Sequence, residues 1–161
     1  MESLAQIMKL VHIGLAMVLV AGLVGRWLVL DAAKRTDEIG RTRSLLAASA
    51  PFERMVILSS MAILPAGFIT AWAQGYPWLG LTTPWMSISL VLALGIGLLV
   101  PTVFLPRGRG FEAALDNATE AGTITPELRA AFDEPAVRAA HWAEIIAIAA
   151  IVAMMVLKPT L

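Results

Sequence analysis

Two histidines and no cysteine are present in this chain, so few side chains can hold a metal ion. His12 lies in the apolar stretch KLVHIGLAMVLVAGL, and Met8 precedes it by four residues, which places both on one side of a helix. Imidazole and thioether groups are ligands of haem iron, and soft thioethers also favour Cu(I). We therefore consider His12 as a metal ligand and Met8 as a second cofactor ligand.

The composition indicates which kind of element carries these residues. Of 161 residues, 58% are hydrophobic and 15% charged, whereas soluble domains average about 25% charged residues. Four apolar segments span approximately residues 7–30, 55–73, 85–105 and 137–157, and about 20 helical residues cross a bilayer. Because hydrocarbon offers no water to backbone groups, the segments should be helices. The sequence predicts an all-α integral membrane four-helix bundle, with one transmembrane domain over residues 1–161.

The charged loops predict the orientation of these spans. Nine basic residues fall in the first and third connections: Lys34, Arg35, Arg41, Arg43, Arg54, Arg107, Arg109, Arg129 and Arg138. The remaining connections offer only Lys9 and Lys158. By the positive-inside rule, the first and third loops are cytoplasmic and both termini are outside (N-out/C-out). The whole chain has twelve basic and twelve acidic residues, so its net charge implies no nucleic-acid partner.

Short amphipathic helices are predicted in both cytoplasmic loops. The stretch RTRSLLAASAPFER resembles an interfacial helix that stops before Pro51. Further along the chain, Pro65 in the second span and Pro101 in the third each remove one helical hydrogen bond, and we expect a kink at each. Small residues four apart, such as Ala21 and Gly25, should allow helices to approach closely.

The third loop contains clear signals for the ends of helices. In TPELRAAFDEP, Thr125 is the expected N-cap of a short helix, with Pro126 at its first position. Asp133 or Glu134 is expected to cap the fourth span. Gly108, Gly110 and Gly122 are interpreted as helix breaks.

The orientation separates the two histidines. His12 is near the outer end of the first span and His141 near the inner end of the fourth, on the order of 20 Å apart along the membrane normal. They cannot share one iron, and we interpret His141 as an interfacial residue. Lys158 ends the fourth span at the outer face. We therefore predict an outer-leaflet pocket between the first and fourth helices, with His12, Lys158 and Met8 as cofactor ligands.

Further thioethers occur at the same predicted depth as this pocket. Met154 and Met155 lie within one turn of Lys158, and Met86 opens the third span. The structural alternative is that His12 makes a hydrogen bond within the bundle. Lys158 would then reach the headgroups, and the methionines would only pack.

Several short motifs resemble known membrane families. The segments VHIGLAMVLVAGLVGRW, FERMVILSSMAILPAGFITAW, PWMSISL and IAAIVAMMVLKP resemble uncharacterised bacterial four-span membrane proteins. More distantly, they resemble the b-haem protoporphyrinogen oxidases and the CopD-like copper-resistance membrane proteins. The oxidases share the first-helix histidine followed by Ala-Gly-Leu (21–23), the Glu53-Arg54 pair and the closing Lys158-Pro159. The resemblance implies haem b bound by His12, with Lys158 as the opposite ligand, in a multi-pass protein of the bacterial cytoplasmic (inner) membrane.

Three functions are consistent with these observations. The first is a membrane protein that binds b-type haem, with a redox or haem-related role. The second is a non-catalytic accessory or scaffold subunit that contacts partner subunits or a second copy within the bilayer. The third is a Cu(I)-handling protein that uses Met8, His12 and Met154 or Met155. No Ser-His-Asp pattern, paired intramembrane carboxylates or phosphate loop indicates a hydrolase, and whether the chain is an enzyme is left open.

Overall fold

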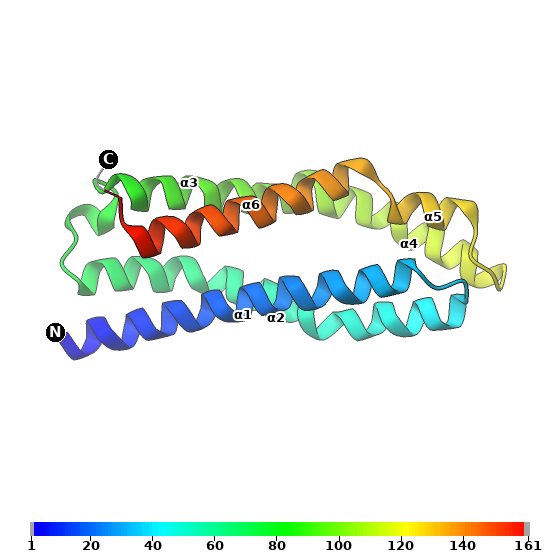
Figure 1. Cartoon of the computed structure of the whole chain (residues 1–161), viewed down its shortest axis with the longest axis horizontal. Coiled ribbons are helices and arrows are strands. Elements are labelled where there is room, and N and C mark those ends of the chain that lie inside the picture. The colour runs from blue at the N-terminus through cyan, green and yellow to red at the C-terminus, as the bar shows by residue number, and fades with distance from the viewer. Residues whose placement is uncertain (1, 160–161) are drawn as a thin grey trace. The chain divides into compact units, whose positions relative to one another are not determined.

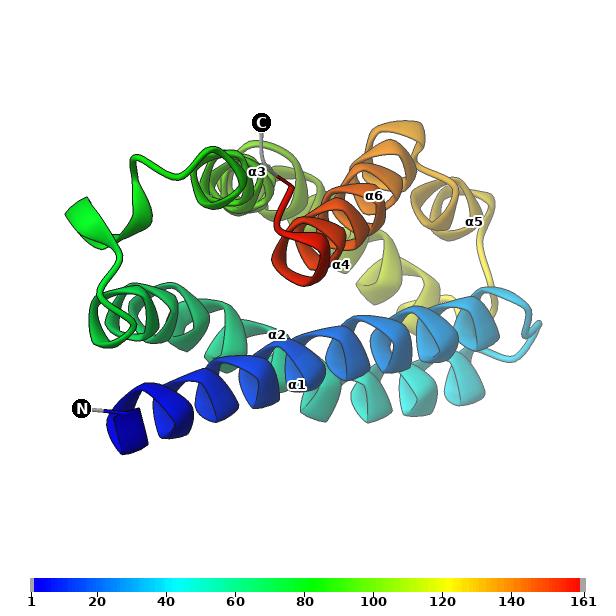
Figure 2. The same cartoon turned by 60° about the vertical axis from the view of Figure 1, so that its left-hand side comes forward.

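The computed structural model describes residues 2–159, and these form helices joined by short connections (Figures 1 and 2). The elements in chain order are α1 (Glu2–Lys34), α2 (Ile39–Ala73), the 3₁₀ turn η1 (Pro77–Gly80), α3 (Pro84–Leu99), the π-helical segment η2 (Val100–Phe104), α4 (Leu105–Glu120), α5 (Pro126–Phe132) and α6 (Pro135–Leu157). No strand occurs among the described residues. The all-α prediction is confirmed.

Four helical stretches are long and apolar enough to cross a membrane: Glu2–Lys34, Ile39–Ala73, Pro84–Glu120 and Pro126–Leu157. They contain the four predicted spans, and each is longer than predicted. The first, for example, has 33 residues and a length of about 50 Å, against about 30 Å for a hydrocarbon core. The helices therefore continue beyond the apolar segments into the polar connections.

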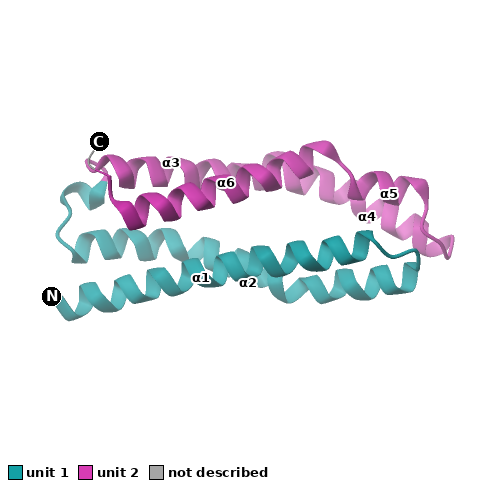
Figure 3. Ribbon diagram, in the orientation of Figure 1, with its two compact units in different colours: residues 1–80 teal, residues 81–161 magenta. Residues whose placement is uncertain are grey.

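The chain divides into two compact units, residues 1–80 and 81–161 (Figure 3). Unit 1 contains α1, α2 and η1, and unit 2 contains the remaining helices. The single domain and the position of both termini outside the membrane stay predictions.

Unit 1 is an antiparallel hairpin in which α1 and α2 pack along their lengths (Figure 1). The residues that face the partner helix recur every seven positions, and none of them is exposed. On α1 they are Met8, Leu15, Gly22 and Val29, together with His12, Leu19, Arg26 and Ala33. On α2 they are Thr42, Ser49, Val56, Ile63 and Thr70. A seven-residue period keeps one seam against the partner, as in a left-handed coiled coil.

Two glycines of α1 allow the helices of this seam to approach closely. A Cβ atom on Gly22 would lie 3.0 Å from the carbonyl oxygen of Phe52 and 3.0 Å from side-chain atoms of Met55 and Val56. A Cβ atom on Gly25 would overlap the ring of Phe52. The prediction that Ala21 and Gly25 both allow close approach of the helices is therefore correct only for Gly25. Ala21 is exposed and Gly22 is buried, because the seven-residue seam passes through position 22.

Polar residues of this seam satisfy their hydroxyl groups within α2. Thr42 Oγ1 donates to the carbonyl of Glu38 at 3.1 Å, and Thr70 Oγ1 donates to the carbonyl of Ala66 at 2.7 Å. Ser49 Oγ lies 2.7 Å from the carbonyl oxygen of Leu46. Such bonds let small polar residues face a partner helix without leaving a buried group unpaired.

The predicted stop before Pro51 is wrong, because α2 runs through Pro51 and Pro65 without interruption. A proline within a helix costs one hydrogen bond and about 3 kcal/mol. Contacts with α1 on both sides offset that cost, since Ser49 and Ser59 are buried before and after Pro51. The expected interfacial helix is thus the first part of a continuous α2.

Unit 2 packs α3 against α6, and α4 against α5 (Figure 1). Pro101 lies in η2, where the backbone N–H of Leu105 bonds to the carbonyl of Val100, five residues earlier. The predicted breaks at Gly108 and Gly110 are wrong, because both lie inside α4. Their backbone remains helical, whereas Gly122 has a φ of +69° and does end the helix.

The predicted start of α5 is confirmed. Pro126 is its first residue, and Thr125 Oγ1 accepts a hydrogen bond from the backbone N–H of Leu128 at 3.3 Å. At α6, Glu134 occupies the N-cap position without a side-chain capping bond. Its Oε1 instead accepts from Nε of Arg107 at 3.4 Å, so the expected capping bond is absent because Glu134 forms an ion pair with α4.

Removal of the Thr125 cap should destabilise α5 locally. We expect Thr125→Ala to cost about 1 kcal/mol and to increase the amide hydrogen exchange of α5, whose Leu128 is fully buried. Hydrogen-exchange mass spectrometry measures this effect. Thr123→Ala is the matched control because Thr123 is exposed and outside the helix. Equal exchange in the two variants would contradict the assigned role of Thr125.

Candidate functional site: the His12 imidazole

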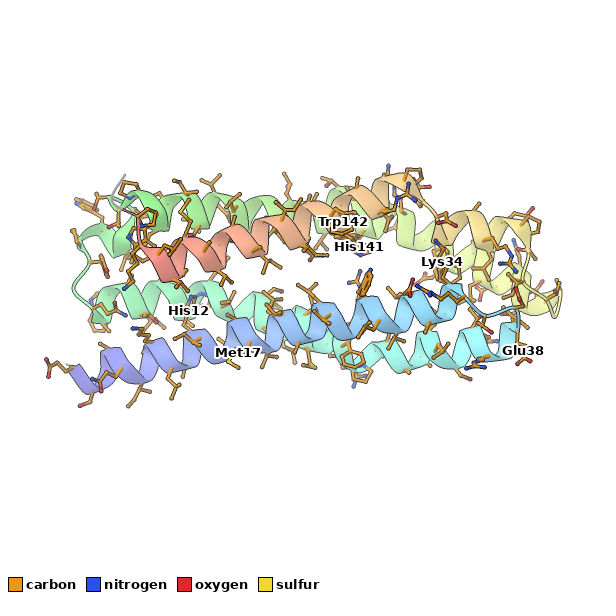
Figure 4. All side chains as sticks on the ribbon, viewed as in Figure 1. His12, Met17, Lys34, Glu38, His141 and Trp142 are labelled. Carbon is orange, nitrogen blue, oxygen red and sulfur yellow. The ribbon has the colours of Figure 1, made fainter. Side chains whose placement is uncertain are left out.

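His12 lies on α1 and faces α2 (Figure 4). Its Nδ1 is 3.1 Å from the backbone carbonyl oxygen of Ile63. Because a carbonyl can only accept a hydrogen bond, Nδ1 must carry the proton. Neutral His12 is therefore the tautomer with a lone pair on Nε2, and Nε2 has no hydrogen-bond partner among residues 2–159.

Gly67 makes this arrangement possible. A Cβ atom on Gly67 would lie 3.0 Å from Cε1 of His12 and 3.4 Å from Nδ1. Gly67 follows Ile63 by four residues, so its missing side chain leaves the Ile63 carbonyl uncovered on the face towards α1. The imidazole occupies the space that any other side chain at position 67 would fill.

The sequence analysis missed Ile63 and Gly67. Backbone carbonyls have no sequence signature, and Ile63 is an ordinary apolar residue. A signal was present at Gly67, because a glycine inside a span with no turn indicates close approach of another group. Its position four residues after Ile63 of the seam became informative only once α1 and α2 were paired.

Met8 and His12 lie one turn apart in the same seam, as predicted from their spacing. Both side chains are half-buried. Side chains four apart on a helix approach an ion from the same side, as in helical zinc sites with two histidines. Met8 and His12 can therefore offer two ligands to one small ion. They cannot bind the two opposite faces of a porphyrin.

Lys158 lies in unit 2 and is tied to the start of α3. Its backbone N–H caps α6 by bonding to the carbonyl of Met154 at 2.9 Å, with a φ of +44°. Its Nζ is 5.8 Å from the centroid of the Trp85 ring, in cation–π geometry. Met86 is the next residue after Trp85, and Met154 and Met155 lie within one turn of Lys158. These predicted neighbours of Lys158 in unit 2 therefore lie at the same end of the α3–α6 pair. The predicted grouping of Lys158 with His12 stays a prediction.

The remaining polar candidates lie elsewhere on the helices. His141 lies on α6 (Figure 4), with its ring centroid 5.0 Å from that of Phe104. Ser49 Oγ in the seam donates to Oε1 of Glu53 at 3.2 Å. Arg26 is a half-buried seam residue. Within residues 2–159, no group of three or more histidine and acidic side chains could hold a metal ion.

Unit 1 also has a shallow apolar hollow on its surface. It has a volume of about 210 Å³ and is lined by Phe68, Ile69, Trp72 and Leu79. His12 is not among these residues. The hollow therefore adds no polar group to the His12 site.

The comparisons with known proteins agree with the membrane architecture. A family model described as "Predicted integral membrane protein (DUF2269)" matches residues 6–159, which include all four candidate spans almost completely. No curated protein and no solved structure matches the chain.

Proposed function

We propose that this chain, which belongs to the DUF2269 family of predicted integral membrane proteins, binds a b-type haem within the bilayer through Nε2 of His12. The membrane we propose is the bacterial cytoplasmic membrane, with both termini outside. The proposed role is redox or haem-related. Bound haem would supply reversible one-electron transfer at its iron.

One observation carries this proposal: the hydrogen bond from Nδ1 of His12 to the carbonyl of Ile63. Histidines that bind metals almost always donate their other ring N–H to a carbonyl or carboxylate, which fixes the tautomer and raises the basicity of the ligating nitrogen. His12 has this arrangement, and the lone pair of Nε2 would be the atom that binds the iron. The donor set also favours haem over a bare ion, since the porphyrin itself supplies four nitrogen ligands.

The residues around His12 have distinct tasks in this proposal. Ile63 accepts the Nδ1 proton and prevents rotation of the ring, and Gly67 leaves room for it. Met8 cannot bind the opposite face of the porphyrin, because it lies on the same side of α1 as His12. The resemblance implies Lys158 as the second ligand, and Met8 packs beside His12.

The direct test is an absorption spectrum of protein purified in mild detergent from haem-replete cells. We expect a Soret band in the wild type and its complete loss in His12→Ala, because no other imidazole is available in unit 1. If Lys158 is the second ligand, as the resemblance implies, Lys158→Ala should keep the band but shift it. Met8→Leu is the matched control on the same helix face and should leave the spectrum unchanged.

Other outcomes would favour the two alternatives. A colourless wild-type protein would refute haem binding. Copper in that protein, lost in both Met8→Leu and His12→Ala, would indicate Cu(I) handling. A partner subunit at fixed stoichiometry without any cofactor would indicate an accessory or scaffold subunit.

A further inference from the structure

A second polar site lies within unit 2 and is independent of His12. Glu144 is the residue of α6 that carries a carboxyl group inside the apolar span, and only 8% of its surface is exposed. Ionisable residues within a bilayer are costly, and they commonly mark proton or substrate pathways.

Three ionisable residues of α6 become more buried from one to the next along the helix. Arg138, His141 and Glu144 recur every three residues, so His141 is a neighbour of both others on the helix surface, while Arg138 and Glu144 lie about 120° apart around the axis. Arg138 is exposed, His141 is half-buried and Glu144 is buried. The series leads from an accessible cation to a buried acid through one imidazole.

The depth of each residue follows from the rise of the helix. Lys158 and Arg138 are separated by about 30 Å along α6, which equals the thickness of a hydrocarbon core. With these two cations at opposite boundaries, Glu144 lies about 9 Å inside the boundary at Arg138. His141 lies about halfway between the two. One imidazole therefore bridges the distance from the boundary to the buried carboxyl group.

The facing helix is irregular at the same depth. Contacts of Lys158 with Trp85 and of His141 with Phe104 define the antiparallel register of α6 against α3 and η2. This register places Glu144 level with the start of η2 at Val100. There the i→i−4 ladder is interrupted, since Pro101 has no N–H and Leu105 bonds to Val100. Such π-helical segments occur frequently at functional sites.

Within unit 2, the elements that pack against α6 add no ionisable group. The helices α3 and η2, which pack against α6, have no titratable residue. On α6 itself, only Arg138 and His141 accompany Glu144. Within these three elements, a proton that reaches Glu144 from the boundary therefore has one imidazole as its relay.

We propose that His141 and Glu144 form a proton-exchange site that opens towards the boundary at Arg138. Water at the boundary protonates the imidazole, and the imidazolium passes a proton to the Glu144 carboxylate. The products are neutral imidazole and a neutral carboxylic acid. The reverse transfer returns the proton to water, so atoms and charge balance.

The test uses the apolar carbodiimide dicyclohexylcarbodiimide, which adds to protonated carboxyl groups in membranes. In the full-length protein in lipid vesicles, we expect a covalent adduct on Glu144 by peptide mass spectrometry, with a yield that rises as the pH is lowered. Glu144→Gln should lose this adduct, while Glu53→Gln in unit 1 should keep it. Wild-type protein that is labelled at Glu144 only after denaturation, or with a yield independent of pH, would overturn the proposal.

A second variant tests the relay. His141→Phe retains an aromatic ring beside Phe104 but has no nitrogen, so packing is preserved. We expect it to slow the deuterium exchange of the Glu144 carboxyl group, measured as the infrared shift of the carboxylic C=O band after transfer to D₂O. Unchanged exchange would remove His141 from the pathway. The mapped adduct on the wild type remains decisive even where a variant fails to fold.

Discussion

Gly22→Leu is expected to destabilise the α1–α2 hairpin by about 3 kcal/mol relative to Gly14→Leu. A side chain at position 22 meets the backbone oxygen of Phe52 and side-chain atoms of Met55 and Val56, each 3.0 Å from its Cβ. A backbone oxygen cannot rotate away as a side chain can, so the helices must separate. Separation removes van der Waals contacts along the seam, and these contacts drive helix association in a membrane.

Gly14→Leu is a close control for this substitution. Both glycines lie on α1, but a Cβ atom on Gly14 meets no heavy atom within 4 Å. The gain in helix propensity from Gly to Leu is the same at both positions and cancels in the comparison. Unfolding by sodium dodecyl sulfate in mixed micelles, followed by circular dichroism, gives the difference. Equal midpoints for the two variants would show that Gly22 has no role in close packing.

Gly67→Leu is expected to weaken haem binding by about 10- to 100-fold, the usual effect of losing a partner of a metal ligand. The new side chain must occupy the space of the imidazole, since even its Cβ lies 3.0 Å from Cε1 of His12. The ring then leaves the Ile63 carbonyl, and Nδ1 is no longer held as the donor. This prediction depends on the proposed haem site.

A second measurement tests the hydrogen bond of the His12 ring independently of haem binding. In protein without haem, ¹⁵N NMR of the imidazole should show the proton on Nδ1 in the wild type and a mixture of tautomers in Gly67→Leu. Gly95→Leu in α3 is the matched control, because nothing lies within 4 Å of a Cβ atom there. A wild-type proton on Nε2 would contradict the hydrogen bond itself. A correct tautomer without any haem binding would refute only the proposed function.

The spans and the helix ends were largely predictable, because their causes are local. Hydrocarbon requires helices of about 20 apolar residues wherever the chain crosses it. Thr125 and Pro126 define the start of α5 through their own hydrogen-bonding and φ preferences. The failure at Pro51 has a tertiary origin. A residue that weakens a helix stops it only where no packing offsets the cost, and α2 is packed against α1 around Pro51.

The candidate site was only half predictable. The sequence alone indicates a candidate ligand and the class of metal that it favours. The indications are the residue type of His12, the absence of cysteine and the spacing to Met8. The tautomer of His12, the roles of Ile63 and Gly67, and the burial of Glu144 depend on which residues of another helix lie opposite. Pairing across helices joins positions up to 51 residues apart, as between His12 and Ile63. Composition and periodicity specify which face of a helix is apolar, whereas only the paired helices decide which backbone carbonyl that face meets.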